Sequence, residues 1–224
     1  MRFIIPSVGF ETELLENKVT VISIDNKPLF TKCIYDLWLQ SKGELGECIL
    51  SNNEEIITFS KSVSLIMNIF DIDVNNKKIL TRVYKELTEN ATDYFSDSFS
   101  EIQKNIVNTM DKLIESVPYS LVYEDSMDIS ALLKLVNMRL NQVEGDPLAL
   151  FFDYIQLESK ICNINTYIVV NIKDYFSEEE LKEFYKFLFY NKINLIIIES
   201  HQSALFPEEK NWIIDEDNCI IEVN

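Results

Sequence analysis

The segment from residue 166 to residue 200 constrains the fold most, because it predicts a strand, a helix and a second strand in direct succession. The two strand sequences, TYIVVNI and INLIIIES, are almost continuously apolar, which is typical of parallel strands buried on both faces of a sheet. The helix between them begins with a capping box formed by Ser177 and Glu180. Such a unit makes a right-handed crossover, so the sequence predicts an α/β fold.

The rest of the predicted α/β domain comes from both ends of the chain. Residues 18–26 predict a strand and a turn, helical spacing follows in FTKCIYDLWLQSKGE, and residues 54–60 predict a short second strand. Further along, Asp146 is a good N-cap for a helix that has Pro147 at its first position. Residues 211–223 predict two short strands that close the domain.

The middle of the chain has a different pattern, which indicates a helical insertion. Two long segments carry apolar residues every three or four positions, as amphipathic helices do, and they meet near Ser96. We expect these two helices to form a hairpin, and a third helix to follow Asp128. The predicted organisation is an α/β head domain of residues 1–60 and 145–224 with a helical leg domain of residues 61–144.

The end of the last apolar strand raises the possibility of nucleotide chemistry. Glu199 and the chain's single histidine, His201, follow that strand, where many nucleotide hydrolases hold a metal. Such enzymes also need a glycine-rich phosphate loop of the form G-x-x-x-x-G-K-[ST]. Here the first strand is followed by IDNKPLFTK, which has no glycine. A degenerate hydrolase or metal-dependent nuclease that uses Glu199, His201, Asp174 or Asp215 is therefore a minor alternative.

Acidic side chains suit a hard cation such as Ca²⁺. Residues 71–82 begin like a calcium-binding EF-hand loop, but they lack its glycine at position six and its glutamate at position twelve. A better candidate set is Glu124, Asp125 and Asp128, joined by Glu144 from the far end of the same segment. The competing interpretation is that these acids only cap a helix and complement its dipole.

Basic residues are few, and the net charge is −17. Such a charge alone disfavours nucleic acid, because binding to DNA usually needs a basic face. The candidate DNA contacts are Lys27 and Lys32 at the first strand–helix turn, and Lys134 and Arg139 in the leg. The competing interpretation is a solvated surface. A groove assembled from several subunits would multiply a modest basic patch.

Cysteine usage and hydropathy indicate where the protein acts. The four cysteines, Cys33, Cys48, Cys162 and Cys219, are far apart and form no C-x-x-C pair, so we expect reduced thiols. No signal peptide is evident at the N-terminus, and no apolar run approaches the roughly 20 residues of a membrane span. We therefore expect a soluble, cytoplasmic protein without membrane contacts.

Three stretches in this order resemble one known family. They are FDIDVNNKKIL before a long helix, INTYIVVNIKDYFSEEELKEFYKFLFYNKINLIIIES, and the tail WIIDEDNCIIEVN. Together they resemble the CRISPR-associated adaptation proteins of type II-A systems, the Csn-type spacer-acquisition proteins, in their short branch. The resemblance covers most of the chain, and none of the motifs is a catalytic signature.

The resemblance implies a fold and a function. It implies a head similar to a P-loop ATPase core without a phosphate loop, together with a helical leg. It also implies a non-enzymatic homotetrameric ring that binds Ca²⁺ and encircles the ends of double-stranded DNA without sequence preference. Such rings act with the CRISPR integrase proteins and the effector nuclease. By position, Glu124, Asp125, Asp128 and Glu144 match the family's calcium ligands best.

One further alternative stays open from the residues alone. The long amphipathic helices and the acidic surface are compatible with a protein–protein scaffold that never binds DNA itself. Only a binding experiment distinguishes such a scaffold from a DNA-end-binding ring.

Overall fold

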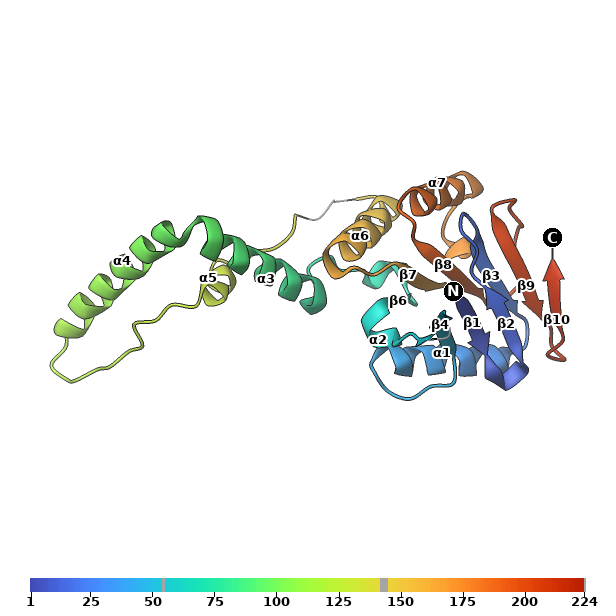
Figure 1. Cartoon of the computed structure of the whole chain (residues 1–224), viewed down its shortest axis with the longest axis horizontal. Helices are drawn as coiled ribbons and strands as arrows, with labels where there is room; N and C mark the ends of the chain where they lie inside the picture. Colours follow the sequence, from blue (N-terminus) through green and yellow to red (C-terminus); the bar gives the residue numbers. More distant parts are fainter. Residues whose placement is uncertain (54, 142–144, 224) are drawn as a thin grey trace. The chain divides into compact units, whose positions relative to one another are not determined.

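The computed structural model describes residues 1–53, 55–141 and 145–223, which divide into two compact units (Figure 1). Unit 1 consists of Met1–Ile72 and Val143–Asn224, and unit 2 consists of Asp73–Gln142. Among the described residues, no helix is both long and apolar enough to span a membrane.

Unit 1 is built on a six-stranded sheet with the order β10-β9-β3-β8-β7-β6. Its strands are β3 (Val19–Ile24), β6 (Val63–Ile66), β7 (Thr166–Val170), β8 (Asn194–Glu199), β9 (Glu209–Ile214) and β10 (Ile220–Val223). All neighbours are parallel except β9 and β10, which are antiparallel. Strands β7 and β8 therefore pair in parallel as the sequence predicts, and the α/β class is confirmed.

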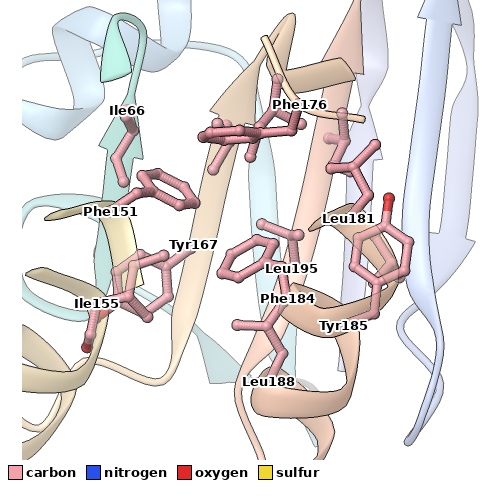
Figure 2. Close-up of a cluster of buried hydrophobic side chains, with 14 of the residues drawn as sticks. Ile66, Phe151, Ile155, Tyr167, Phe176, Leu181, Phe184, Tyr185, Leu188 and Leu195 are labelled. Atoms are coloured by element: carbon pink, nitrogen blue, oxygen red, sulfur yellow. The ribbon is translucent and has the colours of Figure 1, made fainter. Parts of the chain in front are cut away.

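Two-residue periodicity assigns the strand side chains to the two faces of this sheet. Tyr167 and Val169 belong to one core cluster, whereas Ile168 between them belongs to the other. The first cluster is covered by α6 (Pro147–Cys162) and α7 (Glu178–Tyr190). Figure 2 draws its buried residues: Ile66, Phe151, Ile155, Tyr167, Phe176, Leu181, Phe184, Tyr185, Leu188 and Leu195.

The opposite face is covered by α1 (Lys27–Ser41) and by a second sheet that the sequence did not predict. This antiparallel sheet has the order β2-β1-β4-β5. Its strands are β1 (Arg2–Ile5), β2 (Phe10–Glu13), β4 (Ile49–Asn52) and β5 (Glu55–Ile56). Strand β1 pairs with β2 across a short turn and with β4, more than forty residues away. Strand β4 follows α1, so only the tertiary fold brings it to β1.

Local capping chemistry explains where the helices of unit 1 begin. The Asn26 side chain accepts a hydrogen bond from the Leu29 amide at the start of α1, and Asp146 accepts one from Leu148 at the start of α6. At α7 the capping box of Ser177 and Glu180 is present in both directions. The backbone and side-chain hydrogen bonds that Glu180 accepts from Ser177 lower the pKa of Glu180. The predicted starts of α6 and α7 are confirmed.

Unit 2 consists of three helices: α3 (Lys77–Tyr94), α4 (Ser96–Glu115) and α5 (Ile129–Leu135). The expected hairpin is wrong, because α4 leads away from α3 instead of folding back along it (Figure 1). An irregular segment, residues 116–128, returns along α4. The Gln103 side chain donates to the Asp125 carbonyl, and the Tyr123 hydroxyl donates to Asp111. Consequently α4 has no buried residue, although its apolar residues lie on one face.

The boundaries between the units differ from those expected from the sequence. The sequence placed the start of the leg near residue 61, whereas unit 1 continues to Ile72. The reason is β6, a short strand at the edge of the parallel sheet that pairs with β7. Isolated four-residue strands give little periodicity signal, and Phe59–Ser62 just before β6 forms a single helical turn, α2. The predicted third helix after Asp128 is also shorter than expected, since α5 ends at Leu135.

Candidate nucleic-acid interface

A shallow groove on unit 2 brings lysines and hydroxyl groups together. It lies between α3 and α5 and has a volume of about 370 Å³. Its lining residues are Thr81, Tyr84, Lys85, Thr88, Glu89, Ser130 and Lys134. Lysine ammonium groups and side-chain hydroxyls are common donors to the phosphate oxygens of nucleic acids. This composition makes the groove the candidate nucleic-acid interface of the described chain.

Hydrogen bonds between distant residues hold the two walls of the groove in place. Asn75 precedes α3, and its side chain makes two reciprocal bonds to the backbone of Leu140, at 2.8 and 3.1 Å. Within α3, the Tyr84 hydroxyl donates to the Met138 carbonyl at 2.7 Å. These three bonds fasten the chain that follows α5 onto α3. The Asp128 side chain starts α5 by accepting from the Ser130 amide at 2.9 Å.

The electrostatics of the groove are mildly favourable to an anion. Lys85 lies 3.7 Å from Glu89, both side chains being well exposed, so this pair is weak and can be displaced. Lys134 is exposed on the opposite wall. The Thr88 hydroxyl oxygen is buried and forms no hydrogen bond in the described structure.

Charge is distributed unevenly between the two units. Unit 2 carries eight of the 20 Lys and Arg residues but only eleven of the 37 Asp and Glu residues. Its net charge is therefore −3, which leaves −14 for unit 1. Most of the overall charge that argues against DNA binding lies outside the unit that carries the groove.

The four lysines and arginines predicted from the sequence are not brought together within one unit. Lys134 lines the groove, and Arg139 is exposed beyond the end of α5 in the same unit. Lys27 is the exposed first residue of α1, in unit 1. Lys32, also on α1, is 2.7 Å from Glu47, whose hydrogen bond raises the pKa of Lys32. The sequence analysis missed Lys85, although Thr81, Lys85 and Thr88 share one face of α3.

Of the four predicted calcium ligands, the three that lie within the described residues do not gather into a metal site. Asp128 caps α5, whereas Glu124 and Asp125 are exposed on the irregular segment before it. Glu144 lies outside the described residues. Throughout the described ranges, no three His, Cys, Asp or Glu side chains gather as a metal ion would require. Because Ca²⁺ takes six to eight oxygen ligands, this arrangement does not fit the ion without donors from elsewhere.

The strand-end acids form a structural network around the parallel sheet. Glu199 is fully buried and accepts a hydrogen bond from the Lys173 amide at 3.2 Å, while its second oxygen has no partner in the described structure. Burial raises the pKa of Glu199 to about 7, although the bond from Lys173 opposes this shift. His201 lies 3.2 Å from Asp174, and both side chains are about half exposed. Asp215 caps the β9–β10 turn by accepting from the Asp217 and Cys219 amides.

The turn from β3 to α1 cannot hold a phosphate in the manner of a nucleotide hydrolase. It consists of two residues, Asp25 and Asn26, and the Asn26 side chain accepts from the amide of Leu29, the third residue of the helix. Pro28, the second residue of the helix, has no amide hydrogen. A phosphate loop needs several successive free amides around the anion, so this turn lacks the required donors.

Comparison with known proteins identifies the family. Residues 40–218 match the family of CRISPR-associated proteins designated Cas_Csn2, which is more than half of the chain. The chain belongs to the Cas_Csn2 family. The resemblance noted from the sequence is thereby confirmed, and membership of Cas_Csn2 supports a role in CRISPR adaptation and antiviral defence.

The other comparisons add little to the Cas_Csn2 assignment. No curated protein matches the chain. Among solved structures, a putative ATP-binding protein of an ABC transporter from Pyrococcus furiosus aligns with 91% of this chain and 88% of its own. The sequence identity is 11% and the TM-score is 0.40, a similarity too low to argue from.

Proposed function

We propose that this Cas_Csn2 protein is a non-enzymatic protein of CRISPR spacer acquisition that binds the ends of double-stranded DNA without sequence preference. The observation that carries the proposal is the groove of unit 2, where Lys85 and Lys134 face hydroxyl groups. The groove offers donors for phosphate oxygens, and the hydroxyl of its lining residue Tyr84 is already bonded to the Met138 carbonyl. Contacts of this kind bind the DNA backbone and carry no sequence information.

We further propose that the protein acts as a homotetrameric ring in the cytoplasm. What supports self-assembly is α4, a twenty-residue amphipathic helix without a single buried residue. Its apolar face includes Ile102, Ile106 and Leu113, which remain partly exposed. Exposed apolar stripes of this kind are typical of surfaces that become buried between subunits. Four copies would bring four lysine-lined grooves to one DNA duplex, which a single acidic chain could not do.

The roles of Ca²⁺ and of protein partners are separate parts of the proposal. Among the described residues no three acidic, histidine or cysteine side chains gather, so an organising Ca²⁺ ion would need further oxygen donors, from other copies or from residues outside the described ranges. The proposed protein partners are the CRISPR integrase proteins and the effector nuclease, which the family resemblance implies. The phosphate contacts come from the groove itself, and Ca²⁺ would affect DNA binding only by organising the ring.

A gel-shift comparison tests the proposal and its alternatives. Linear duplex DNA and the same DNA as a covalently closed circle are each mixed with protein, in Ca²⁺ and in chelator. We expect a shift of linear DNA only, and a loss of that shift in chelator if Ca²⁺ organises the ring. Equal shifts of both forms would discard threading over DNA ends. If neither form shifted, the acidic scaffold that binds only proteins would be the better interpretation.

Replacing both groove lysines tests the site itself. The double variant Lys85→Ala, Lys134→Ala is expected to bind linear duplex at least roughly tenfold more weakly, because each copy loses two phosphate contacts. The slope of log affinity against log salt should also become shallower, since fewer counterions are released. Lys186→Ala, an exposed lysine on α7 of unit 1, is the matched control. Equal losses in both variants would show a general charge effect and would remove the groove from the proposal.

A further inference from the structure

The exposed side of α1 carries an apolar groove that none of the described residues of unit 1 covers. The groove is lined by Phe30, Thr31, Ile34, Tyr35 and Trp38 of α1 and by Met67, which follows β6, and its volume is about 450 Å³. Tyr35 stacks on Trp38 with 5.8 Å between ring centroids. Met67 and Tyr35 are both exposed. Concave surfaces rich in Trp, Tyr and Met are typical of protein docking sites.

Lysines mark both ends of this groove. Lys27 is the first residue of α1, and Lys42 directly follows its last turn. The Lys42 ammonium group lies 3.5 Å from the centre of the Trp38 ring, so its charge is held over the apolar floor. Lys32 of α1 forms an ion pair with Glu47, which lies beyond the helix, and Asp36, the one acid of α1, also attracts the charge of Lys32. In a unit whose net charge is −14, an apolar groove flanked by lysines favours an apolar ligand that carries acids.

A segment of unit 2 has this chemistry on its surface. Tyr123 is fastened to α4, because its hydroxyl donates to the Asp111 carboxylate at 2.7 Å and to the Val107 carbonyl at 3.3 Å. The side chains on either side of Tyr123 are not held in this way and are open to solvent. Val122 is 95% exposed, and Glu124 is exposed as well. We call residues 121–125, with the sequence LVYED, the acidic edge.

We propose that the acidic edge of one copy docks in the α1 groove of a second copy. Val122 would enter the groove beside Ile34 and Trp38, and Glu124 would meet the Lys42 ammonium group. The spacing is compatible, because two residues of chain allow Val122 and Glu124 to lie at most about 7 Å apart. Trp38 and Lys42 are about 6 Å apart along a helix. The contact joins different surfaces of the two copies, so it can be repeated around a ring.

A nucleic-acid strand is the less favoured occupant of this groove. Base stacking needs a free aromatic face, but Lys42 covers one face of Trp38 and Tyr35 stacks against its ring. The floor between the two end lysines is apolar, and Thr31 and Tyr35 supply the hydroxyl groups among its lining residues. The acidic edge, in contrast, supplies both an exposed aliphatic side chain and a carboxylate at matching distances.

Charge exchange tests the proposed contact, which rests on the self-assembly put forward under the proposed function. Sedimentation velocity of the full chain measures assembly for wild type, Lys42→Glu, Glu124→Lys and the double variant. Each single change is expected to weaken association roughly tenfold, because two like charges meet at the contact. The double variant is expected to regain most of the loss. Thermal unfolding of each variant verifies that the fold is unchanged.

Val122→Asp tests the apolar part of the contact. We expect association to weaken on the order of thirtyfold, as at a central contact of an interface. Leu45→Asp is the matched control, because Leu45 is also 95% exposed but does not line the groove. Equal effects of the two changes would overturn the proposal.

Cross-linking distinguishes the possible occupants. In a Cys219→Ser background, one preparation carries Lys42→Cys and another carries Glu124→Cys. Mild oxidation of the mixture is expected to give a covalent dimer that neither preparation gives alone. If a chain that carries both cysteines forms the disulfide only within one molecule, the proposal is overturned. It is also overturned if Lys42→Glu abolishes binding of single-stranded DNA and leaves assembly intact.

The outcomes also separate this inference from the proposed function. If the wild-type chain is a monomer at all concentrations, both the proposed ring and the proposed contact fail. If the chain assembles and none of the variants changes its association, only the contact between the acidic edge and the α1 groove fails.

Discussion

Lys173→Met is expected to lower the free energy of unfolding by about 3–5 kcal/mol, because it removes one partner of a buried ion pair. The Lys173 ammonium group is 2.8 Å from Glu209, and the two side chains are only 4% and 0% exposed. It also donates to the Ala204 carbonyl at 2.7 Å. The variant would leave the Glu209 carboxylate buried with the Tyr185 hydroxyl and the Phe206 amide as its remaining donors. Urea unfolding followed by circular dichroism measures the difference.

A matched control separates burial from charge. Lys32 and Glu47 form an ion pair of similar length, 2.7 Å, but both side chains are about half exposed. Lys32→Met is therefore expected to change stability only slightly, because solvent screens an exposed pair. In the Lys173→Met background, Glu209→Gln should recover part of the loss, since the carboxylate charge is gone. If Lys173→Met were no more destabilising than Lys32→Met, the buried pair would contribute nothing beyond an exposed one.

Glu199→Gln is expected to remove a pH-dependent loss of stability of about 3 kcal/mol. Burial raises the pKa of Glu199 from its ordinary value of 4.5 to about 7 in the folded chain. Between these two values the unfolded chain has lost the proton while the folded chain keeps it. The wild-type fold therefore loses stability as pH rises through this window, and the loss is complete above pH 7. Below pH 4.5 both states are protonated and Glu199 contributes no pH dependence.

Wild type and Glu199→Gln are compared by the slope of the free energy of unfolding against pH. The free energy of unfolding is measured from about pH 4 to about pH 9 for wild type and for Glu199→Gln, a range that spans both pKa values. In the described structure the second Glu199 oxygen has no hydrogen-bond partner. One polar atom of the introduced amide takes its place, so the substitution lowers the free energy of unfolding by the same amount at every pH. The variant should nevertheless gain on wild type as pH rises. Glu179→Gln, an exposed position on α7, should follow the wild-type slope, and parallel curves for Glu199→Gln would contradict the prediction.

Several elements could be predicted because their causes are local in the chain. The near-continuous apolar strands on either side of α7 predicted a parallel pair, and the structure pairs Tyr167 with Leu195 in that arrangement. The capping signals at Asp146 and Ser177 placed two helix starts correctly. The missing phosphate loop could also be inferred, because it depends on a few adjacent residues after β3.

Other features could not be predicted, because they depend on contacts between distant residues. The second sheet requires β1 to meet β4, and the four short strands in it give little periodicity. The expected α3–α4 hairpin was wrong because an amphipathic pattern indicates that one face of a helix is covered, but not which segment covers it. In this chain the irregular segment after α4 lies along it, and Tyr123 and Gln103 make that contact.

The sequence by itself determined the α/β class, the helix starts around the parallel sheet and the resemblance to the Cas_Csn2 family, because periodicity, caps and motif order are properties of neighbouring residues. Only the tertiary structure brought Lys85 to Lys134 across one groove and buried Lys173 against Glu209. Those pairs are 49 and 36 residues apart in the chain. Their meeting depends on helix packing and strand order, which side-chain spacing along the chain does not encode.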